Sequence, residues 1–349
     1  MSHRTALGHL TVLDATDGVS GQYCGRLLSD FGASVTLLEP TNGTSTRRTG
    51  PFDKSGHSFL FQHLNLGKES GSRESLAERA RNADIALLDP SENADALRAE
   101  NTQLITCTIS DFGVDGPRKD WKGGELIHQA LSGVMYRNGD PKRHPLYGCG
   151  HRSYYVAGVA AYSSVLAAIF ARGKTGRGQH CSIDVAECAA SMTYAFATQY
   201  NYNRVLERRT TPANLPSAVL QCSDGWISVF IYAYRWKEAC EALNVPDLAA
   251  DPAYATAEGR MEHWPKIVAR IQESVRELPA DVVVDRLQSL GSVAGKAARP
   301  SQLGDHPHLL ARGYWESVDA GDGPRTILGP PFRMEKTPRV LPSVRRMAS

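Results

Sequence analysis

The chain lacks several features that mark common classes of protein. Its 39 basic and 37 acidic residues leave a formal net charge of +2, so no broad electropositive surface for nucleic acid or an anionic membrane is expected. Seven cysteines are scattered along the chain without any CxxC pair, which argues against a disulfide framework or a zinc knuckle. We therefore expect buried thiols in a reducing cytoplasm, and no metal site.

Signal and membrane segments are also missing from the pattern. The opening residues "MSHRTALGHLTVLDATDG" run straight into a strand, without the basic and then apolar stretch of a signal sequence. The longest apolar run, residues 156–171, is too short for a bilayer core of about 30 Å. A soluble, cytoplasmic protein is expected.

Acidic residues are absent from one long interval. Between Asp140 and Asp184 the chain contains no Asp or Glu, although this interval holds a predicted apolar helix, residues 154–171, preceded by the polar stretch 144–153. Two interpretations follow. The segment is the wall of an active site that has lost its acid, or it is simply part of the core.

The first third of the chain alternates short apolar runs with amphipathic segments. Residues 10–14 are followed by the turn "GVSG", an amphipathic stretch and a second apolar run, which together predict a βαβ unit. Residues 83–90 and 103–110 repeat the pattern of buried strands. This order predicts an α/β fold with a parallel, doubly wound sheet.

The sequence pattern changes near Pro212. "SAVLQC", the turn "SDG" and "WISVFIY" predict a hairpin, and polar helical segments follow over residues 260–277 and 280–290. We therefore expect a large domain over residues 1–211 and a small α+β domain over 212–318. The Pro- and Gly-punctuated segment 319–349 is expected to be extended and to return to the large domain.

The first βα turn does not carry a dinucleotide signature. "DGVSGQYCG" is not GxGxxG, and no acid is placed to hold an adenosine ribose. A helix starting near Gly21 would still present free N–H groups to a phosphate. Basic residues recur on the predicted carboxyl side of the sheet, namely Arg47, Arg48, Lys68 and Lys122. Each alone could be a solvated charge, but the set fits a polyanionic ligand better.

Three further residue groups allow two interpretations each. Glu125, flanked by glycines, either stands close to a ligand or caps its own helix through the dipole. His128 is more typical of a core histidine than of a base. Cys149 and His151 could form a nucleophilic pair, but adjacency in sequence is not the geometry that such pairs need.

Taken together, the segments resemble family III CoA-transferases, the CaiB/BaiF family of formyl-CoA transferase and α-methylacyl-CoA racemase. The resemblance lies in the order of "VLDATDGVSGQYCGRLLSDFGASVTLLEP", "TRRTGPF", "LNLGKES", "SDFGVDGP", "ALSGVM", "AGVAAYSSVLAAIFARGKTGRGQHCSIDVAE", "SDGWISV", "HPHLLARGYW" and "GPPFRMEKTP", which covers nearly the whole chain. It implies a Rossmann-like large domain, a small domain and two subunits interlocked like links of a chain. It also implies that the chain acts on coenzyme A (CoA) thioesters.

The resemblance implies which residues bind CoA. The phosphates of CoA suit the four basic residues named above. The residues placed at the CoA site are Gly18, Val19, Ser20, Arg48, Asn65, Lys68, Asp89 and Lys122. Glu125 takes the acidic position of a Tyr-Asp or His-Asp pair in the family. Counting back from "TGRGQ" places the family's catalytic aspartate at Ser153, and the racemase histidine falls at Gly124.

The departures at Ser153 and Gly124 leave the reaction open. The first hypothesis is an enzyme that transfers CoA between carboxylic acids, or otherwise acts on the acyl-CoA, with Glu125 or another group replacing the aspartate. The second is a CoA-binding subunit that pairs with an Asp-bearing sister chain. An acyl-CoA racemase, isomerase or lyase variant, or a protein that holds acyl-CoA without chemistry, completes the alternatives. A homodimer is expected, with a heterodimer as the alternative.

Overall fold

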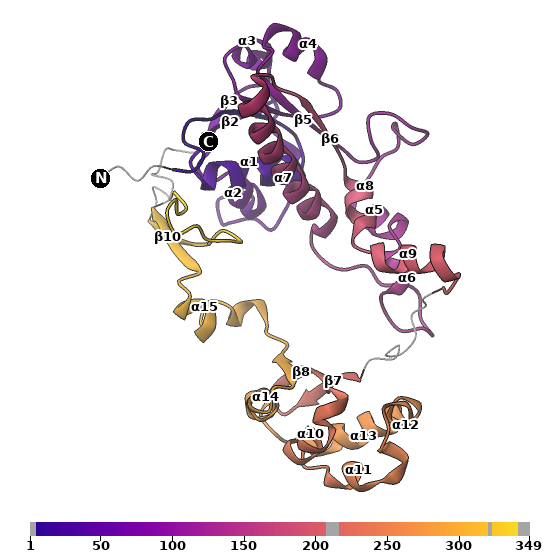
Figure 1. Cartoon of the computed structure of the whole chain (residues 1–349). Coiled ribbons are helices and arrows are strands. Elements are labelled where there is room, and N and C mark those ends of the chain that lie inside the picture. Colours follow the sequence, from indigo (N-terminus) through magenta and orange to yellow (C-terminus); the bar gives the residue numbers. More distant parts are fainter. Residues whose placement is uncertain (1–4, 207–215, 320–322, 341–349) are drawn as a thin grey trace. The chain divides into compact units, whose positions relative to one another are not determined.

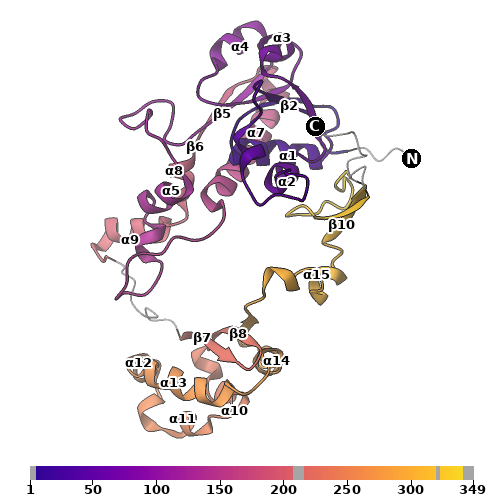
Figure 2. The same ribbon diagram turned by 180° about the vertical axis from the view of Figure 1, so that it is seen from behind.

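The computed structural model describes residues 5–206, 216–319 and 323–340 (Figures 1 and 2). The chain forms two compact units, Met1–Arg208 together with Ala311–Ser349, and Arg209–Leu310. The domain boundary expected at 211/212 lies outside the described residues. The second unit ends at Leu310, before the boundary at residue 318 that the sequence suggested.

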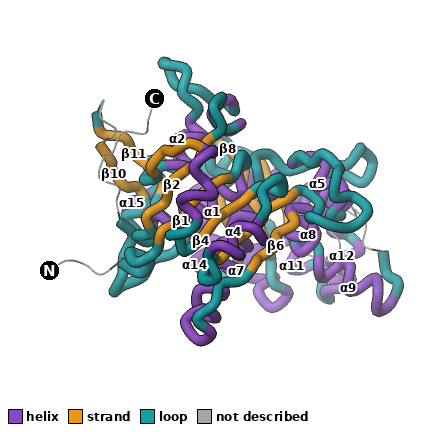
Figure 3. Tube along the Cα trace, turned by 90° about the horizontal axis from the view of Figure 1, so that it is seen from above, coloured by secondary structure: helices purple, strands orange, loops and turns teal. Residues whose placement is uncertain are grey.

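The first unit is built on a six-stranded sheet in which every neighbouring pair is parallel. Its strand order is β3-β2-β1-β4-β5-β6, and Figure 3 shows β1, β2, β4 and β6 from above. The strands are β1 (Thr11–Ala15), β2 (Ser34–Glu39), β3 (Glu69–Ser72), β4 (Ile85–Leu88), β5 (Ile105–Ser110) and β6 (His180–Asp184). This order reverses direction between β1 and β4, and it confirms the predicted doubly wound α/β class.

Helices cover both faces of this sheet, because the central strands are apolar on both sides. Val12 packs into one hydrophobic cluster with α1 (Val19–Asp30) and α7 (Arg152–Thr175). Its neighbour Leu13 packs into another cluster with α3 (Leu76–Ala80) and α4 (Ala94–Glu100). The helices of this unit are α1 (Val19–Asp30), α2 (Phe59–Asn65), α3 (Leu76–Ala80), α4 (Ala94–Glu100), α5 (Glu125–Leu131), α6 (Val134–Arg137), α7 (Arg152–Thr175), α8 (Val185–Ser191) and α9 (Tyr194–Asn203), with 3-10 turns η1 (Ser45–Arg48) and η2 (Arg73–Ser75). Helix α15 (Pro307–Ala311) belongs to the second unit except for its last residue, Ala311.

Helices α1 and α7 lie side by side on one face of the sheet (Figure 1). A Cβ on Gly158 of α7 would lie 2.8 Å from the carbonyl oxygen of Ser20, so glycine permits this close approach. By length and composition α7 would suffice to cross a membrane. Its buried face, including Ala157, Ala161 and Val165, instead packs in the core of this unit, as in many soluble proteins.

The second unit has its own sheet and hydrophobic cluster. Strands β7 (Ser217–Cys222) and β8 (Gly225–Phe230) form the predicted hairpin, and β9 (Val293–Lys296) pairs antiparallel to β8. Helix α13 (Trp264–Val275) packs Trp264, Ile267 and Ile271 into this core. The remaining helices are α10 (Trp236–Ala242), α11 (Pro246–Ala250), α12 (Ala257–Glu262) and α14 (Ala280–Ser289), with 3-10 turns η3 (Ala233–Arg235), η4 (Pro252–Tyr254) and η5 (Pro300–Gln302).

The described part of the C-terminal segment packs on α1 and α2 of the first unit. Strands β10 (Trp315–Asp319) and β11 (Pro324–Leu328) pair antiparallel. Arg339 forms an ion pair with Asp30 of α1, with 2.9 Å between nitrogen and oxygen. Phe332 stacks on Phe31 with ring centroids 4.5 Å apart. The segment therefore contains a hairpin as well as extended chain.

Candidate functional site

A cavity of about 320 Å³ opens at the carboxyl ends of β1 and β4, where the strand order reverses. Ligands of open parallel sheets bind at this position. Backbone and side chains from six separate segments surround the cavity. Its lining consists of Thr16, Gly18, Val19, Ser20, Gly21, Ser45, Thr46, Thr49, Asp89, Pro90, Ile109, Ser110, Asp111, His151, Tyr154 and Val185.

The N-terminus of α1 forms one wall of the cavity. Gly18 is its extended N-cap and contributes no side-chain cap, so the first N–H groups of the helix are available to an anion. The buried hydroxyl of Ser20 has no hydrogen-bond partner within the described ranges. Gly21 is required by packing, because a Cβ there would lie 2.3 Å from Oγ1 of Thr16. This wall supplies donors without a partner, as a phosphate ligand requires.

Asp89 closes another side of the cavity, directly after β4. Its carboxylate accepts a hydrogen bond from the backbone N–H of Asp17 at 3.0 Å, and Asp17 in turn accepts from the N–H of Ser45 at 2.6 Å. Burial raises the pKa of Asp89 to about 7, against the opposing charge of Arg73. Asp89 is therefore partly protonated at neutral pH.

Asp111, directly after β5, is the most strongly held carboxylate that lines the cavity. Its Oδ1 lies 2.9 Å from Nε2 of His128 and accepts from the hydroxyl of Tyr154 at 3.4 Å, while Oδ2 accepts from the N–H of Gly123 at 3.1 Å. Burial raises the pKa of Asp111, but the hydrogen bonds from His128, Gly123 and Tyr154 outweigh it, so the pKa lies below its usual value. Burial and the charge of Asp111 raise the pKa of Tyr154, which stays a phenol.

Glu125 and Ser153 contact each other and do not line the cavity. Ser153 is fully buried, and both its N–H and its hydroxyl donate to the Glu125 carboxylate, at 3.0 and 3.1 Å. Gln129 donates a further hydrogen bond at 2.6 Å. Glu125 thereby binds at the N-terminus of α7, where the helix dipole favours an anion. Neither residue is part of the cavity lining, and their catalytic roles stay predictions.

Lys68 and Asn65 lie in a buried polar network behind α1. The ammonium of Lys68 donates to Asp14 at 2.7 Å, to the carbonyl of Gln22 at 2.7 Å and to Asn65 at 2.8 Å. Burial lowers the pKa of Lys68, and Asp14 opposes this shift. All three protons of the ammonium are used inside the protein. We therefore no longer expect Lys68 to contact a phosphate directly.

Arg48 and Lys122 are exposed side chains close in sequence to the cavity lining. Arg48 ends η1, whose Ser45 and Thr46 line the cavity, and its guanidinium donates to the carbonyl of Asn42 at 2.9 Å. Lys122 precedes Gly123, the donor to Asp111. The structure thus brings Gly18, Val19, Ser20 and Asp89 into one cavity and leaves Arg48 and Lys122 outside its lining.

Sequence reasoning missed Asp111, Tyr154 and Thr16 as residues of this site. A signal for Asp111 existed, because it directly follows a buried strand in "ITCTISD" and the carboxyl ends of parallel strands meet at one edge. His151 lines the cavity, whereas Cys149 is exposed outside its lining. Within the residues that the structure describes, no group of three metal-ligating side chains is found.

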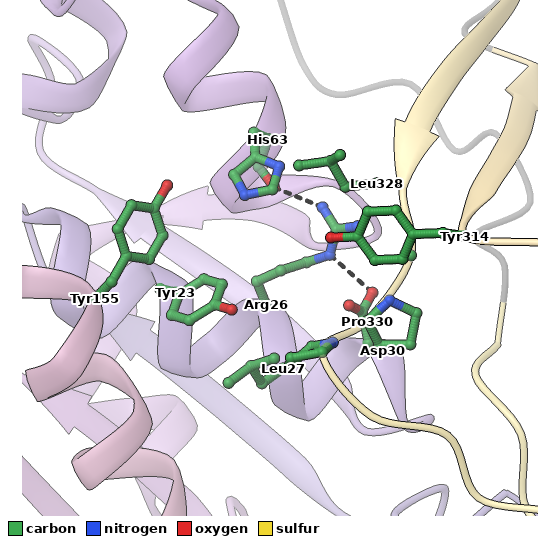
Figure 4. A pocket seen from close by; sticks show the side chains of 11 residues that line it. Tyr23, Arg26, Leu27, Asp30, His63, Tyr155, Tyr314, Leu328 and Pro330 are labelled. Carbon is green, nitrogen blue, oxygen red and sulfur yellow. Dashed lines mark hydrogen bonds and ion pairs between the residues drawn. The ribbon is translucent and has the colours of Figure 1, made fainter. Parts of the chain in front are cut away.

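A second cavity, of about 240 Å³, lies between α1 and the C-terminal segment (Figure 4). Arg26 projects into it from α1 but is engaged, donating to Asp30 at 2.7 Å and to the carbonyl of His63 at 2.5 Å. Burial and the charge of Arg26 lower the pKa of His63 to about 4. The guanidinium of Arg26 is thus held by protein groups, and His63 is uncharged at neutral pH.

The sequence and the structure of this chain are similar to those of known proteins. The sequence model described as CoA-transferase family III matches residues 7–345. The chain is 29% identical to the succinyl-CoA:mesaconate CoA-transferase of Haloarcula marismortui, covering 95% of this chain and 91% of that protein. It is 24% identical to the succinyl-CoA–L-malate CoA-transferase beta subunit of Chloroflexus aurantiacus, covering 97% and 90%. A solved CAIB/BAIF family protein from Brucella suis superposes with a TM-score of 0.87 at 25% identity, covering 97% and 95%.

Proposed function

Because the chain belongs to CoA-transferase family III, we propose that it transfers CoA from an acyl-CoA thioester to a free carboxylic acid. The cavity at the β1/β4 reversal carries this proposal. Its lining contains both the unpartnered donors of α1 and the carboxylate of Asp111. A phosphate-bearing carrier and a reacting acyl group need such a combination of anion-binding donors and a reactive side chain.

The first wall of the cavity is proposed to bind CoA. The N–H groups that follow Gly18 and the hydroxyl of Ser20 would receive a phosphate, while Val19 packs at the same helix start. Asp89, when protonated, is a hydrogen-bond donor, and when ionised it is an acceptor for a ribose hydroxyl. Arg48 and Lys122 would add positive charge from the exposed rim, as loosely held groups that need no rearrangement of the core.

Short carboxylic acids are the first substrates to test, because two relatives are named for succinyl-CoA. The purified chain should be mixed with acetyl-, succinyl- and formyl-CoA and with a panel of mono- and dicarboxylic acids. Mass spectrometry of the thioester pool then reports any new acyl-CoA. The appearance of acceptor thioesters supports the proposal, and hydrolysis alone contradicts it.

Gly18 offers a variant that blocks the cavity without disturbing the fold. A side chain at Gly18 would meet no atom within 4 Å at its Cβ, and the backbone there is extended at φ −103°. Gly18→Phe should therefore fold, fill part of the cavity and raise KM for the acyl-CoA by about tenfold or more. Gly173→Ala, whose Cβ also meets nothing within 4 Å, is the matched control. Equal KM values would place CoA elsewhere.

The family resemblance also supports a dimer in the cytoplasm. Large apolar side chains of α5 and α9, including Leu126, Leu131 and Tyr200, are exposed on the single chain, and exposed apolar groups of this kind mark contact surfaces. A homodimer is the simplest assembly. A heterodimer with an Asp-bearing sister chain is the alternative, and one relative is named as a beta subunit.

A further inference from the structure

The interval without acidic residues, 141–183, carries positive charge that is not balanced locally. Lys142, Arg143 and Arg152 lie in its first part, close in sequence to the cavity residues His151 and Tyr154. Within the described ranges none of these three cations forms an ion pair. An excess of one charge beside a cavity favours ligands of the opposite sign. We therefore examine what an anionic group at this place would contact.

We propose that Arg152 binds a second carboxylate of the acid substrate, so that the chain prefers short dicarboxylic acids to monocarboxylic acids of the same length. This inference rests on the proposed function, because it concerns the acids between which CoA is transferred. Arginine suits this role, since its planar guanidinium presents paired N–H donors that match the two oxygens of a carboxylate. Arg152 is then a specificity-determining residue that takes no part in bond making.

Arg152 occupies a position that its own helix does not favour. It is the first residue of α7, and the first turn of α7 contains no acidic residue. The positive end of the helix dipole lies there and disfavours a cation. Glu125 accepts hydrogen bonds from the N–H and the hydroxyl of Ser153 at this end, but in the described part of the chain it forms no ion pair with Arg152. A cation kept against the local preference is expected at a functional position.

The backbone beside Arg152 holds its guanidinium in place. A Cβ on Gly148 would lie 2.5 Å from Nη1 of Arg152, so the guanidinium occupies the space that a side chain at this position would need. The buried amide of Gln129 fixes Gly148, accepting from its N–H at 2.7 Å and donating to its carbonyl at 3.0 Å. The exposed side chain of Arg152 makes no hydrogen bond to any described residue. Its donors are therefore positioned and open to a ligand.

The cavity beside Arg152 restricts which acids fit. Its volume is about 320 Å³, at the small end of ligand pockets, which range from about 300 to 1,000 Å³. The ionised carboxylate of Asp111 lies on its wall, so a second carboxylate would be repelled inside the cavity. His151 lines the cavity, and the Cα of Arg152 is one peptide further, about 3.8 Å away. A short acid in the cavity would therefore place its second carboxylate at the rim, beside Arg152.

Arginines that follow other strands of the sheet are already engaged. Arg47 pairs with Glu39 at 2.7 Å, and Arg73 pairs with Glu92 at 3.0 Å between nitrogen and oxygen. Recruiting either guanidinium to a substrate would break an existing ion pair, whereas Arg152 is available as it stands.

The test compares acids of equal chain length that differ in one carboxylate. The purified chain is given acetyl-, succinyl- or formyl-CoA together with ¹³C-labelled succinate or butyrate, and then glutarate or pentanoate. Mass spectrometry of the labelled thioesters gives kcat/KM for each acid. We expect wild type to prefer each dicarboxylic acid by about tenfold or more. Arg152→Gln should lose most of this preference by raising KM for the dicarboxylic acids, with the monocarboxylic acids unchanged.

Two further variants serve as controls. Arg152→Lys keeps the charge and should recover part of the preference. Arg177→Gln removes an exposed cation of the same interval beyond the end of α7 and should keep all of it. Arg152→Gln should unfold no earlier than wild type, because it removes a cation from a helix N-terminus. The ratio between two acids within one variant does not depend on how much of the protein is folded.

The outcomes separate this inference from the proposed function. Equal kcat/KM for the paired acids in wild type would overturn the role of Arg152 and leave CoA transfer intact. An unchanged preference in Arg152→Gln, or an equal loss toward both acids, would do the same. Wild type that transfers CoA to none of the acids would overturn both.

Discussion

Asp89 and Asp111 both follow strands of the parallel sheet, yet their pKa values shift in opposite directions. Burial dominates at Asp89, where the carboxylate also lies near the charge of Asp17, and raises the pKa to about 7. At Asp111 the donors from His128, Gly123 and Tyr154 outweigh burial and lower the pKa. One cavity therefore contains an acid that exchanges its proton near neutrality and another that stays ionised, a separation typical of functional sites.

The raised pKa of Asp89 has a measurable effect on stability. The folded protein holds this proton up to about pH 7, whereas an unfolded aspartate loses it near pH 4. Between these values the folded state binds more protons, so the free energy of unfolding falls as pH rises from about 4 to 7. Asp89→Asn removes this loss. Its Tm relative to wild type should therefore rise between pH 5 and pH 8.

The control for this experiment is Asp120→Asn, which changes an exposed carboxylate. Its Tm relative to wild type should be the same at both pH values. A constant difference for Asp89→Asn as well would mean that Asp89 titrates in the folded protein as it does in the unfolded chain.

Variants of Lys68 test whether this buried lysine stabilises the fold or binds the ligand. Lys68→Met leaves Asp14 fully buried without its ion pair, and an unpaired buried charge costs about 3–5 kcal/mol. Urea unfolding should show this loss. The double variant Lys68→Met/Asp14→Leu should recover much of it, because neither charge then remains. Full stability of the single variant would contradict the buried network.

At the scale of elements, the packing of α1 against α7 forms the structural base of the site. Gly158→Ala would introduce a Cβ 2.8 Å from the Ser20 carbonyl, which forces the helices apart and should cost about 1–3 kcal/mol of unfolding free energy. Gly173→Ala in the same helix meets nothing and should gain about 0.5–1 kcal/mol. Similar unfolding midpoints for the two variants would show that the contact carries no strain.

Strands with apolar residues could be predicted from the sequence, and polar ones could not. Residues 10–14, 83–90 and 103–110 were identified because both faces of these central strands are buried. Strand β3, with the sequence ESGS and mostly exposed residues, lies at the sheet edge and carries no apolar pattern. Its pairing with β2 depends on backbone hydrogen bonds that any sequence can form.

The site shows the same limit. The family resemblance placed Gly18, Val19, Ser20 and Asp89 at the CoA site, and in the structure all four line one cavity at the sheet edge. Asp111 directly follows a strand as well, but its contacts with His128 and Gly123 are tertiary and leave no mark on sequence spacing. The pairing of Lys68 with buried Asp14 could not be predicted, because a lysine that pairs with a buried aspartate looks, in sequence, like any other basic residue.

At the scale of the whole molecule, the oligomeric state is the first property to measure. We expect a dimer with extensive buried contact, because the family resemblance implies interlocked subunits and the single chain exposes apolar residues of α5 and α9. Sedimentation velocity at micromolar concentration should give the mass of two chains. A compact monomer would contradict this expectation, and it would also weaken the case for a partner subunit.

Label exchange between a thioester and its own acid tests the central claim, CoA transfer by this chain, most directly. Each acyl-CoA of the panel is incubated with the ¹³C-labelled form of its own carboxylic acid, so the unknown identity of the acceptor does not matter. The account predicts that the purified chain moves label into the thioester, with the total amount of thioester conserved. Thioester that stays unlabelled across the panel, whether intact or hydrolysed, would contradict it.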